Sequence, residues 1–404
     1  MNLSYKYNLI SVSLYIIDTS NMKFIHISDL HIGKRVNEKS LIDEQKHILE
    51  QICRITGSRN PDAVLIAGDI YDKAVPSGEA VLLFDDFLTR LSTLCDHIFI
   101  ISGNHDSAER MAFGARLMNS KGIHLSPVYD GPSGCVTLSD GYGEADIYML
   151  PYIRPANVRH VISEEEKDKI DSYDSAVRKA VEMMGVDPGR RNVLITHQFV
   201  TGAARSESED VNVGGLDNVD ASAFDSFDYV ALGHLHKPQD CGDERIRYSG
   251  SPMKYSFSEV NDSKSVTLIT LKEKGAIERE FIPLVPLHDW HDLRGTYEEL
   301  TARDFYAGTA WTEDFVRITL TDEQDIPDAI GKLRTIYHNL MELRYDNKRT
   351  RAGNEAIEGS TGTAEKTPME LFSELYVRQN GDGLSPQQED YLKKVMEKIW
   401  EDDK

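Results

Sequence analysis

The 404-residue sequence has few of the features that mark a secreted or membrane-spanning protein. Its four cysteines are far apart and form no Cys-x-x-Cys pair, which argues against a disulfide framework and against a thiolate zinc site. No apolar run reaches the roughly 18 residues of a membrane-spanning helix. Lys and Arg number 45 against 67 Asp and Glu, a net charge of −22, which argues against binding a polyanion by bulk attraction. We therefore expect a cytoplasmic protein that makes no membrane contact.

The first residues stand apart from the rest of the chain. Met22 directly precedes Lys23-Phe24-Ile25-His26-Ile27, which has the pattern of an opening strand. We therefore expect residues 1–21 to be an extension of the folded protein, arising from a mis-assigned start.

Short apolar runs return along residues 22–284 and predict buried strands at 24–27, 63–67, 98–101, 193–195 and 229–232. Helical patterns lie between the first three runs, at 40–56 and 78–94, and a further helix is expected from 107 to a stop at Gly122. This alternation predicts an α/β domain over residues 22–284, closed by a hairpin around 265–282. A strand, helix and strand at 315–345 predict a small α+β capping domain over residues 285–345.

The remainder of the chain differs in composition. Residues 346–366 are polar and glycine-containing, which predicts a flexible linker. Residues 367–404 then contain two helix starts of the same kind, each with a hydroxyl residue, a proline and a Glu or Gln two residues after it, and both helices are amphipathic. Such helices either pack on the body of the protein or form a module that docks a partner. The docking candidates are Leu371, Phe372, Leu375, Leu392, Met396 and Trp400.

Polar clusters follow each of the five predicted strands. In an open α/β sheet, ligands bind at the carboxyl ends of the strands, so these clusters could meet in one place. The metal-ligand candidates are Asp29, His31, Asp69, Asn104, His197, His234 and His236, with His105 beside them. Oxygen and imidazole donors suit Mn²⁺, Fe²⁺ or Zn²⁺. Seven donors are too many for one ion but suffice for two ions that share a bridging carboxylate.

Each cluster alone has an ordinary structural interpretation. An Asp-x-His pair often caps a helix or binds backbone, and a Gly-Asp pair after a strand is often a turn. Gly103-Asn104-His105-Asp106 and Gly233-His234-Leu235-His236 are more specific. Their occurrence in this order, each after a strand, is hard to explain by core packing and favours the metal site.

The order of these motifs, D-x-H, G-D-x-x-D, G-N-H-D, H and G-H-x-H, resembles the signature of the calcineurin-like metallophosphoesterases. More narrowly, three longer segments resemble the SbcD family of bacterial nuclease subunits: 27–34, 233–239 and 248–257. The resemblance is strong over the first domain and weak beyond residue 285. It implies a metallophosphoesterase-type β-sandwich core flanked by helices.

The resemblance also implies roles for individual residues. One ion would be held by Asp29, His31, Asp69 and His236, and the other by Asp69, Asn104, His197 and His234. His105 would act beside the scissile phosphate as a charge stabiliser or proton donor, and Asp106 would orient it. Some relatives carry a histidine at the position of Asp72, so a part for Asp72 in exonuclease chemistry is uncertain.

The family further implies a Mn²⁺-dependent DNA exonuclease and endonuclease for break and hairpin processing. Its partner is an ATPase that resembles SbcC, and two copies of this chain would form a homodimer within a heterotetramer. The sequence has no Gly-x-x-x-x-Gly-Lys-Ser/Thr motif and cannot supply the ATPase itself. Local cations at Lys34, Arg35 and Lys237 are the candidates for phosphate contact.

Two other functions share these features. One is a phosphomonoesterase or phosphodiesterase acting on a small substrate, and the other is a catalytically silent scaffold. The DNA nuclease is preferred because the metal-ligand set is complete, whereas a degenerate enzyme usually loses ligands first.

The two terminal helices generate a prediction. Because short helices are marginal alone in water, their apolar faces need a surface to cover them. If the ATPase partner supplies it, a chain ending at Lys366 should fold and keep Mn²⁺-dependent cleavage of short single strands but lose the partner. The triple change Leu392→Ala, Met396→Ala and Trp400→Ala should weaken the complex by roughly 2–4 kcal/mol. Co-elution of the purified chains measures this, and aggregation of the truncated chain would instead place the helices on the body of the protein.

Overall fold

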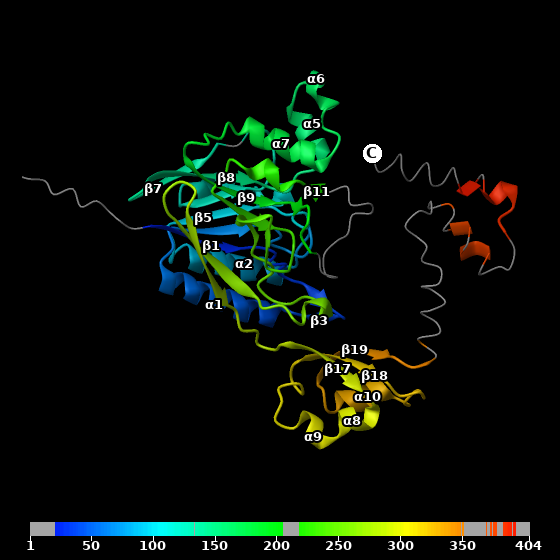
Figure 1. Ribbon diagram of the computed structural model, residues 1–404. Helices are drawn as coiled ribbons and strands as arrows, with labels where there is room; N and C mark the ends of the chain where they lie inside the picture. The colour runs from blue at the N-terminus through cyan, green and yellow to red at the C-terminus, as the bar shows by residue number, and fades with distance from the viewer. Residues whose placement is uncertain are drawn as a thin grey trace, which may run out of the picture. The chain divides into compact units, whose positions relative to one another are not determined.

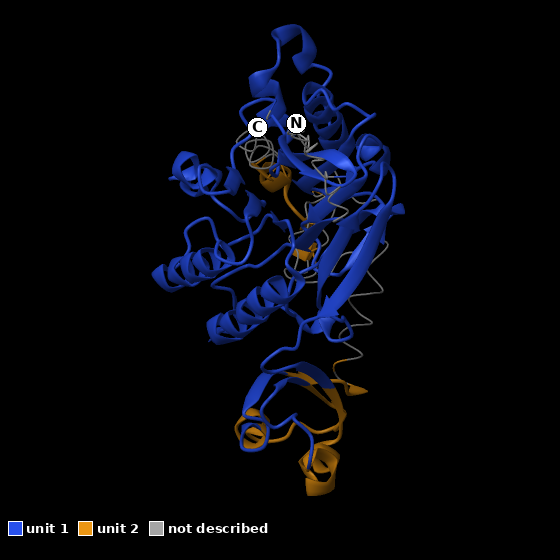
Figure 2. Ribbon diagram, turned by 90° about the vertical axis from the view of Figure 1, so that its left-hand side faces the viewer, with its two compact units in different colours: residues 1–292, 308–317, 334–342 blue, residues 293–307, 318–333, 343–404 orange. Residues whose placement is uncertain are grey.

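The computed structural model describes residues 21–132, 134–204, 218–348 and 350, and, further on, 369, 372–373, 375–377, 383–389 and 391–392. The predicted extension before Met22 thus lies outside the described residues, apart from Asn21. The chain divides into two compact units, one of residues 1–292, 308–317 and 334–342, the other of 293–307, 318–333 and 343–404 (Figure 2). Within the described ranges, no helix is both long and apolar enough to cross a membrane.

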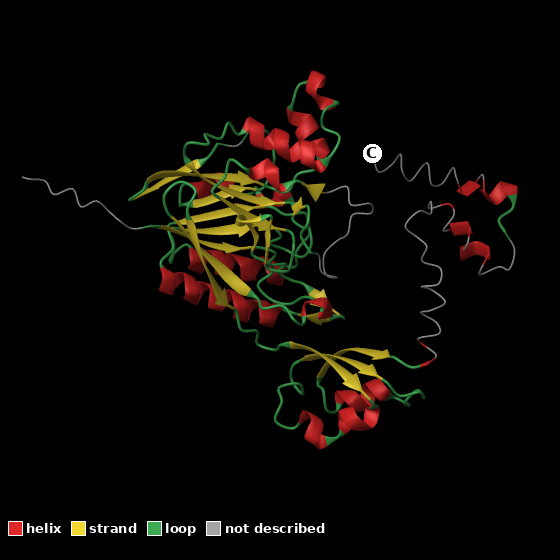
Figure 3. Ribbon diagram, in the orientation of Figure 1, coloured by secondary structure: helices red, strands yellow, loops and turns green. Residues whose placement is uncertain are grey.

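The first unit is built on two six-stranded sheets (Figure 3). The first sheet has the order β16-β15-β1-β4-β5-β6. Its strands are β1 (Met22–Ile27), β4 (Ala63–Ala67), β5 (His97–Ile101), β6 (Ile123–Ser126), β15 (Ser265–Leu271) and β16 (Ile277–Pro283). The second sheet has the order β13-β14-β12-β9-β8-β7. Its strands are β7 (Val136–Asp140), β8 (Gly143–Leu150), β9 (Arg191–His197), β12 (Tyr229–Gly233), β13 (Gln239–Cys241) and β14 (Asp243–Tyr248).

Four neighbouring strands in each sheet are parallel. In the first sheet these are β1, β4, β5 and β6. In the second they are β8, β9, β12 and β14. The five predicted strands and the closing hairpin β15–β16 are therefore present, but the strands belong to two sheets rather than one. The predicted β-sandwich is confirmed.

Helices cover the outer face of each sheet (Figure 1). The first sheet packs on α1 (Ile42–Arg59) and α2 (Gly78–Leu91), and the second on α5 (Pro155–Val161) and α7 (Tyr173–Met183). The shorter elements of this part are β2 (Arg35–Val36), β3 (Lys39–Ser40), α3 (Ala108–Met111), α4 (Ala115–Asn119), α6 (Glu164–Lys167), β10 (Phe199–Val200), β11 (Asn218–Val219), η1 (Ala221–Phe224) and η2 (Phe257–Glu259).

The strands are apolar throughout because both of their faces are buried. Along β1, Ile25 and Ile27 face the helices while Phe24 faces the second sheet. Along β12, Val230 and Leu232 face the helices of the second sheet, whereas Tyr229 and Ala231 face the first sheet. The two-residue period of the strand thus supplies a core between the sheets and a core beneath each helix layer.

A buried histidine links the two sheets. The Nε2 of His26 on β1 lies 3.1 Å from the carbonyl oxygen of Leu232, and its Nδ1 lies 2.8 Å from the hydroxyl of Tyr229. Burial and the charge of Arg247 lower the pKa of His26 to about 3, so the ring is neutral. A carbonyl can only accept, so Nε2 donates to Leu232 and Nδ1 accepts the Tyr229 hydroxyl proton.

Two predicted helices differ from those observed. The helix expected from 107 to 122 is broken into α3 and α4 by Gly114, whose φ of +77° favours glycine. The first helix continues past Gly57 and ends at Asn60, which adopts the left-handed conformation. In both cases the choice of terminating residue was the uncertain part of the prediction.

Residues 290–345 form a separate three-stranded sheet of order β17-β18-β19. Its strands are β17 (Trp290–Gly295), β18 (Phe315–Leu320) and β19 (Asn339–Tyr345), accompanied by α8 (Tyr297–Thr301), α9 (Arg303–Tyr306) and α10 (Ala329–Arg334). The predicted strand, helix and strand over 315–345 are present. The sequence missed β17, in which only Trp290 and Leu293 are buried. Beyond residue 345, Asn347 is buried and donates to the carbonyl oxygen of Asp322. Most of the predicted linker, from 351 to 366, lies outside the described residues.

The ion pair of Arg191 with Asp140 yields a stability prediction. Both side chains are buried, and Asp140 also accepts from the backbone N–H of Met22. Burial alone would raise the pKa of Asp140, but hydrogen bonds from Arg191 and from backbone amides hold it below its ordinary value. Asp140→Asn should therefore cost about 1–3 kcal/mol at neutral pH in urea unfolding. A carboxyl with a lowered folded pKa stabilises above its unfolded pKa, so the difference from wild type should shrink as pH falls below about 4.

Candidate metal centre

All five polar clusters follow parallel strands and come from both sheets. Asp29 and His31 follow β1, Asp69 follows β4, and Asn104 and His105 follow β5. His197 ends β9, and His234 and His236 follow β12. The seven predicted ligands approach one another within one region because β4 of the first sheet lies against β9 and β12 of the second.

A first cluster contains Asp29, His31 and His236. Each offers a ligand atom, these atoms lie within 4.8 Å of one another, and all three side chains are buried. The Nε2 atoms of His31 and His236 face each other at 3.0 Å. At this distance the two nitrogens can share one proton, with one ring donating to the lone pair of the other, or both lone pairs can bind one cation.

A second cluster contains Asn104, His197 and His234. The Oδ1 atom of Asn104 lies 3.0 Å from Nε2 of His197 and 3.0 Å from Nδ1 of His234. His197 uses its other nitrogen, Nδ1, to donate to the carbonyl oxygen of Ala67 at 2.8 Å. In the neutral ring this leaves the Nε2 lone pair facing the amide oxygen, which is the arrangement that a metal ion requires.

Asp69 lies between the two clusters. Its Oδ2 atom is 3.6 Å from Nε2 of His31 and 3.3 Å from Nε2 of His197. Its Oδ1 atom accepts the backbone N–H of His105 at 2.9 Å. One oxygen of Asp69 therefore faces both sets of imidazoles, which is the place of a bridging carboxylate.

Burial lowers the pKa of His31 well below its ordinary value, whereas the electrostatics around His197 favour positive charge. Burial alone would lower the pKa of His197, but the carboxylates of Asp69 and Asp29 raise it to about 9. For Asp69, burial acts to raise the pKa, yet the neighbouring imidazoles hold it well below the ordinary value. A proton that the carboxylates hold on His197 must leave when a metal ion binds there, because a ligand histidine has to be neutral. The chemistry and placement of the donors thus fit divalent ions.

The backbone at the site is strained. Asp29, His31, Asp69 and His234 have φ values of 54°, 42°, 50° and 107°, so they account for four of the eight non-glycine residues with positive φ in the described chain. Such conformations cost of order 1–3 kcal/mol each and concentrate at functional sites. These residues lie in sharp turns at the strand ends, and their positive φ values direct the side chains toward the site.

His105 lies at the edge of the clusters. Its Nδ1 is 3.1 Å from the carbonyl oxygen of Asp72, and its Nε2 is 4.0 Å from Oδ2 of Asp69. The side chain is 20% exposed, whereas those of the imidazole ligand candidates His31, His197 and His236 are at most 2% exposed. An incoming phosphate can therefore reach this ring.

Asp106 contacts backbone rather than solvent. Its carboxylate accepts the N–H groups of Ile70, Tyr71 and Gly103 at 3.0–3.1 Å. Burial and the charge of Asp69 raise its pKa to about 6 in spite of these bonds. Asp106 thus joins the loops after β4 and β5, and its expected role in orienting His105 stays a prediction.

The three candidate phosphate contacts differ in their surroundings. Lys34 donates to Asp72 at 2.8 Å and its side chain is largely buried, so its charge is already paired. Arg35 is exposed and bonds the carbonyl oxygen of Glu38. Lys237 is exposed and directly follows His236 of the first cluster. All three stay predictions, and Arg35 and Lys237 are the better placed.

The docking candidates are only partly described. Leu371, Met396 and Trp400 lie outside the described residues. Phe372 and Leu375 are exposed, at 39% and 52%, and Leu392 is half-buried. The docking module stays a prediction.

Sequence reasoning missed the groups that lie behind the predicted metal ligands. Glu259 lies behind His236 with Lys264 as its ion-pair partner, and Tyr255 packs beside His31 and His236. Burial alone would raise the pKa of Glu259, but His236 and Lys264 hold it well below its ordinary value. None of these residues belongs to a motif with recognisable metal spacing, although Tyr255 falls inside one of the segments that resemble SbcD.

Comparison with known proteins agrees with this geometry. The model of the family described as calcineurin-like phosphoesterase matches residues 22–238, and the chain belongs to this family. The model described as type 5 capsule protein repressor C-terminal domain matches residues 283–380. The chain is 32% identical over 326 residues to the SbcD subunit of nuclease SbcCD from Staphylococcus epidermidis, covering 80% of this chain and 85% of the relative.

Two solved structures are also similar to this chain. One is a protein of Thermus thermophilus, with a TM-score of 0.36, and the other a dimetal phosphatase from Danio rerio, with a TM-score of 0.34. Each is 12% identical and matches 65% of this chain and 99% of its own. The family assignment confirms the predicted phosphoesterase fold, and the family together with the clustered donors supports the use of divalent metal ions.

The packing around Asp69 gives a prediction. A Cβ added at Gly103 would lie 2.0 Å from Oδ1 of Asp69, so Gly103→Ala must displace that carboxylate. We expect Mn²⁺ affinity to fall about tenfold or more, measured by calorimetric titration. Gly78→Ala is the matched control, because a Cβ there has no atom within 4 Å. Equal affinities in the two variants would contradict a role for Asp69 in holding metal.

Proposed function

We propose that this chain is a two-metal DNA exonuclease and endonuclease that works with an ATPase partner in double-strand-break and hairpin processing. The observation that carries the proposal is the buried donor set, in which Asp69 faces one cluster of His31 with His236 and another of Asn104 with His197. The similarity to a nuclease subunit supports DNA as the substrate. The subunit name of that relative supports a second chain as partner, in which we expect the ATPase.

Two divalent ions, most suitably Mn²⁺, would be held by seven ligands. Asp29, His31 and His236 would bind one ion, Asn104, His197 and His234 the other, and Asp69 both. Bound ions of this kind act as Lewis acids on a phosphate oxygen and stabilise the charge of an in-line displacement. Oxygen and imidazole donors without thiolates suit Mn²⁺ but do not select it alone.

His105 is the proposed catalytic residue. Hydrolysis forms a bond from a water oxygen to phosphorus and breaks the bond from phosphorus to a sugar oxygen, which must leave with a proton. The contact of Nδ1 with the Asp72 carbonyl oxygen orients the ring and keeps a proton on Nδ1. The partly exposed Nε2 can then carry the second proton, stabilise the phosphate charge and protonate the leaving oxygen.

The acidic balance of the chain fits a division of labour. With a net charge of −22, this chain contributes little long-range attraction for a duplex. Arg35 and Lys237 would contact phosphates near the site, and the partner would hold most of the duplex. We further propose a cytoplasmic location, because the four cysteines are free thiols, as is usual in a reducing compartment.

An assay on three substrates tests the function. The wild-type chain in Mn²⁺ should cleave labelled single-stranded DNA and a hairpin faster than it hydrolyses p-nitrophenyl phosphate. His105→Asn should keep both ions while slowing cleavage about 10²–10⁴-fold. Hydrolysis of p-nitrophenyl phosphate alone would favour a small-substrate phosphoesterase. Inactivity of the metal-loaded wild type on all three would favour a scaffold.

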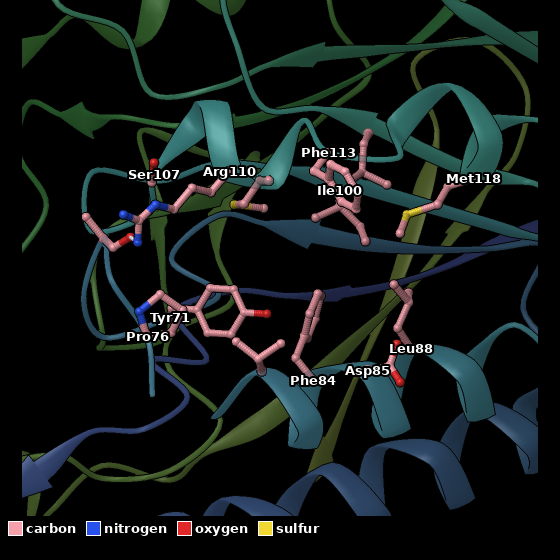
Figure 4. A pocket seen from close by; sticks show the side chains of 14 residues that line it. Tyr71, Pro76, Phe84, Asp85, Leu88, Ile100, Ser107, Arg110, Phe113 and Met118 are labelled. Carbon is pink, nitrogen blue, oxygen red and sulfur yellow. Dashed lines mark hydrogen bonds between the residues drawn. The ribbon is translucent and has the colours of Figure 1, made fainter. Parts of the chain in front are cut away.

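Two copies of this chain are the proposed core of a heterotetramer with two ATPase subunits. The support is an apolar surface over α2 and the α3–α4 segment, where Leu82, Phe113 and Leu117 are 67%, 88% and 78% exposed. Phe113 also lines a cleft of about 570 Å³ between these helices (Figure 4). An exposed apolar surface of this kind marks an interaction site, and a two-fold dimer pairs one such surface with its own copy.

The molecular mass of the protein in solution tests the proposed dimer. Leu82→Glu combined with Phe113→Glu should convert a dimer into a monomer in sedimentation experiments, because charges would be buried at the interface. Val128→Glu is the control, since Val128 is exposed but lies outside these segments. A dimer that persists in the double variant would place the interface elsewhere.

A further inference from the structure

A buried ion pair lies directly behind His236. Glu259, at the end of η2, and Lys264, just before β15, are 2.6 Å apart, and their side chains are 0% and 4% exposed. The pair lies inside the first unit and none of its atoms belongs to the seven predicted ligands. Metal binding by those seven residues therefore does not explain why Glu259 and Lys264 are buried as an ion pair.

Both members of the pair contact the same residue. The Nζ of Lys264 donates to the carbonyl oxygen of His236 at 2.8 Å, and also to Ser251 at 3.1 Å. The Oε1 of Glu259 lies 3.6 Å from Nδ1 of His236, a charge contact slightly longer than a hydrogen bond. The ion pair thus holds His236 at its backbone and at its ring.

The surroundings keep these contacts in place. The backbone N–H of Ser251 also donates to the carbonyl oxygen of His236, at 3.1 Å. A Cβ at Gly250, whose φ is +74°, would lie 2.6 Å from that oxygen. Glu259 accepts from the hydroxyl of Ser256 at 3.0 Å and from the backbone N–H of Tyr255 at 3.3 Å. The chain from 249 to 264 therefore wraps around one histidine.

Stability alone is a weak reason for such a pair. The desolvation of two buried charges cancels most of their attraction, so an apolar pair of similar size is often as stable. A carboxylate behind a metal-binding histidine has a different use, because it fixes which nitrogen carries the proton and makes the ligand more basic. In the other cluster the corresponding partner of His197 is a neutral carbonyl oxygen, that of Ala67.

We propose that Glu259 and Lys264 are positioning residues that hold His236 so that its Nε2 faces Asp29 and His31, and that they strengthen one metal site selectively. The inference rests on the proposed function, in which His236 is a metal ligand. It implies that the two metal sites differ in affinity. The affinity of the site that contains His236 should depend on the Glu259–Lys264 ion pair, and the affinity of the other site should not.

Mn²⁺ titration of the full chain by calorimetry tests this. Wild type should bind two ions, and His236→Ala should lose or greatly weaken one binding step. Glu259→Gln should weaken that same step about 10–100-fold and leave the other step within about threefold. Unchanged affinity at both steps in Glu259→Gln, or equal loss at both, would overturn the proposal.

Two further variants separate positioning from folding. Asp140→Asn breaks another buried ion pair and should lower the unfolding temperature without changing either Mn²⁺ step. If Glu259→Gln does not fold, the double change Glu259→Gln with Lys264→Met leaves no unpaired buried charge and should show the same selective loss. A double variant that binds both ions as wild type does would overturn the proposal.

The titration also separates this inference from the proposed function. A wild-type chain that binds fewer than two ions, or a His236→Ala variant that binds both normally, would refute the ligand assignment itself. Normal wild-type and His236→Ala results with an unaffected Glu259→Gln would refute only the role of the ion pair.

Discussion

The structure depends on the burial of carboxylates and imidazoles in a space from which water is nearly excluded. Asp29 and Asp69 are 0% and 2% exposed, and burial is the largest influence on the pKa of each. Charges in such a place must be compensated by protons or cations, because the surrounding protein cannot solvate them as water does. The four strained backbone positions and the close-packed glycines follow from bringing these groups together. A protein designed only for stability would not gather them.

The sandwich explains how so many donors can meet without long loops. Parallel strands of two sheets end at the same edge, so the candidate ligands lie at the site although none is more than four positions beyond the end of its strand. Short turns hold side chains more firmly than long loops, which is what metal ligands need. These short turns require strained backbone conformations, which are the positive φ values at Asp29, His31, Asp69 and His234.

Much of this could be predicted from the sequence because the informative residues lie close to apolar runs. The strands were readable from continuous hydrophobicity, and the candidate ligands from polar residues placed just after them. The arrangement into two sheets was not readable from periodicity, and it came from the family resemblance. Gly114 and Asn60 show the limit for helices, since the sequence does not tell which of several turn-forming residues ends an element.

The contacts of the supporting residues could not be predicted because their partners are distant in the sequence or ordinary backbone groups. Asp106 follows the ligand loop, yet its bonds go to backbone amides near residue 70. Glu259 and Lys264 look like surface residues of a polar loop and acquire their role only from burial next to His236. Such roles depend on three-dimensional proximity, which a pattern along the chain does not contain.

The bridge made by His26 has a consequence for how a substrate is handled. Its neutral ring joins β1 to β12 through one donated and one accepted hydrogen bond, and sliding of one sheet over the other would leave both groups unpaired in the interior. These hydrogen bonds therefore oppose movement between the strands that carry the two halves of the candidate metal centre. Under the proposed function, adjustment during a catalytic cycle would then fall to the nucleic acid, whose strands would bend or separate to bring a phosphate to the site.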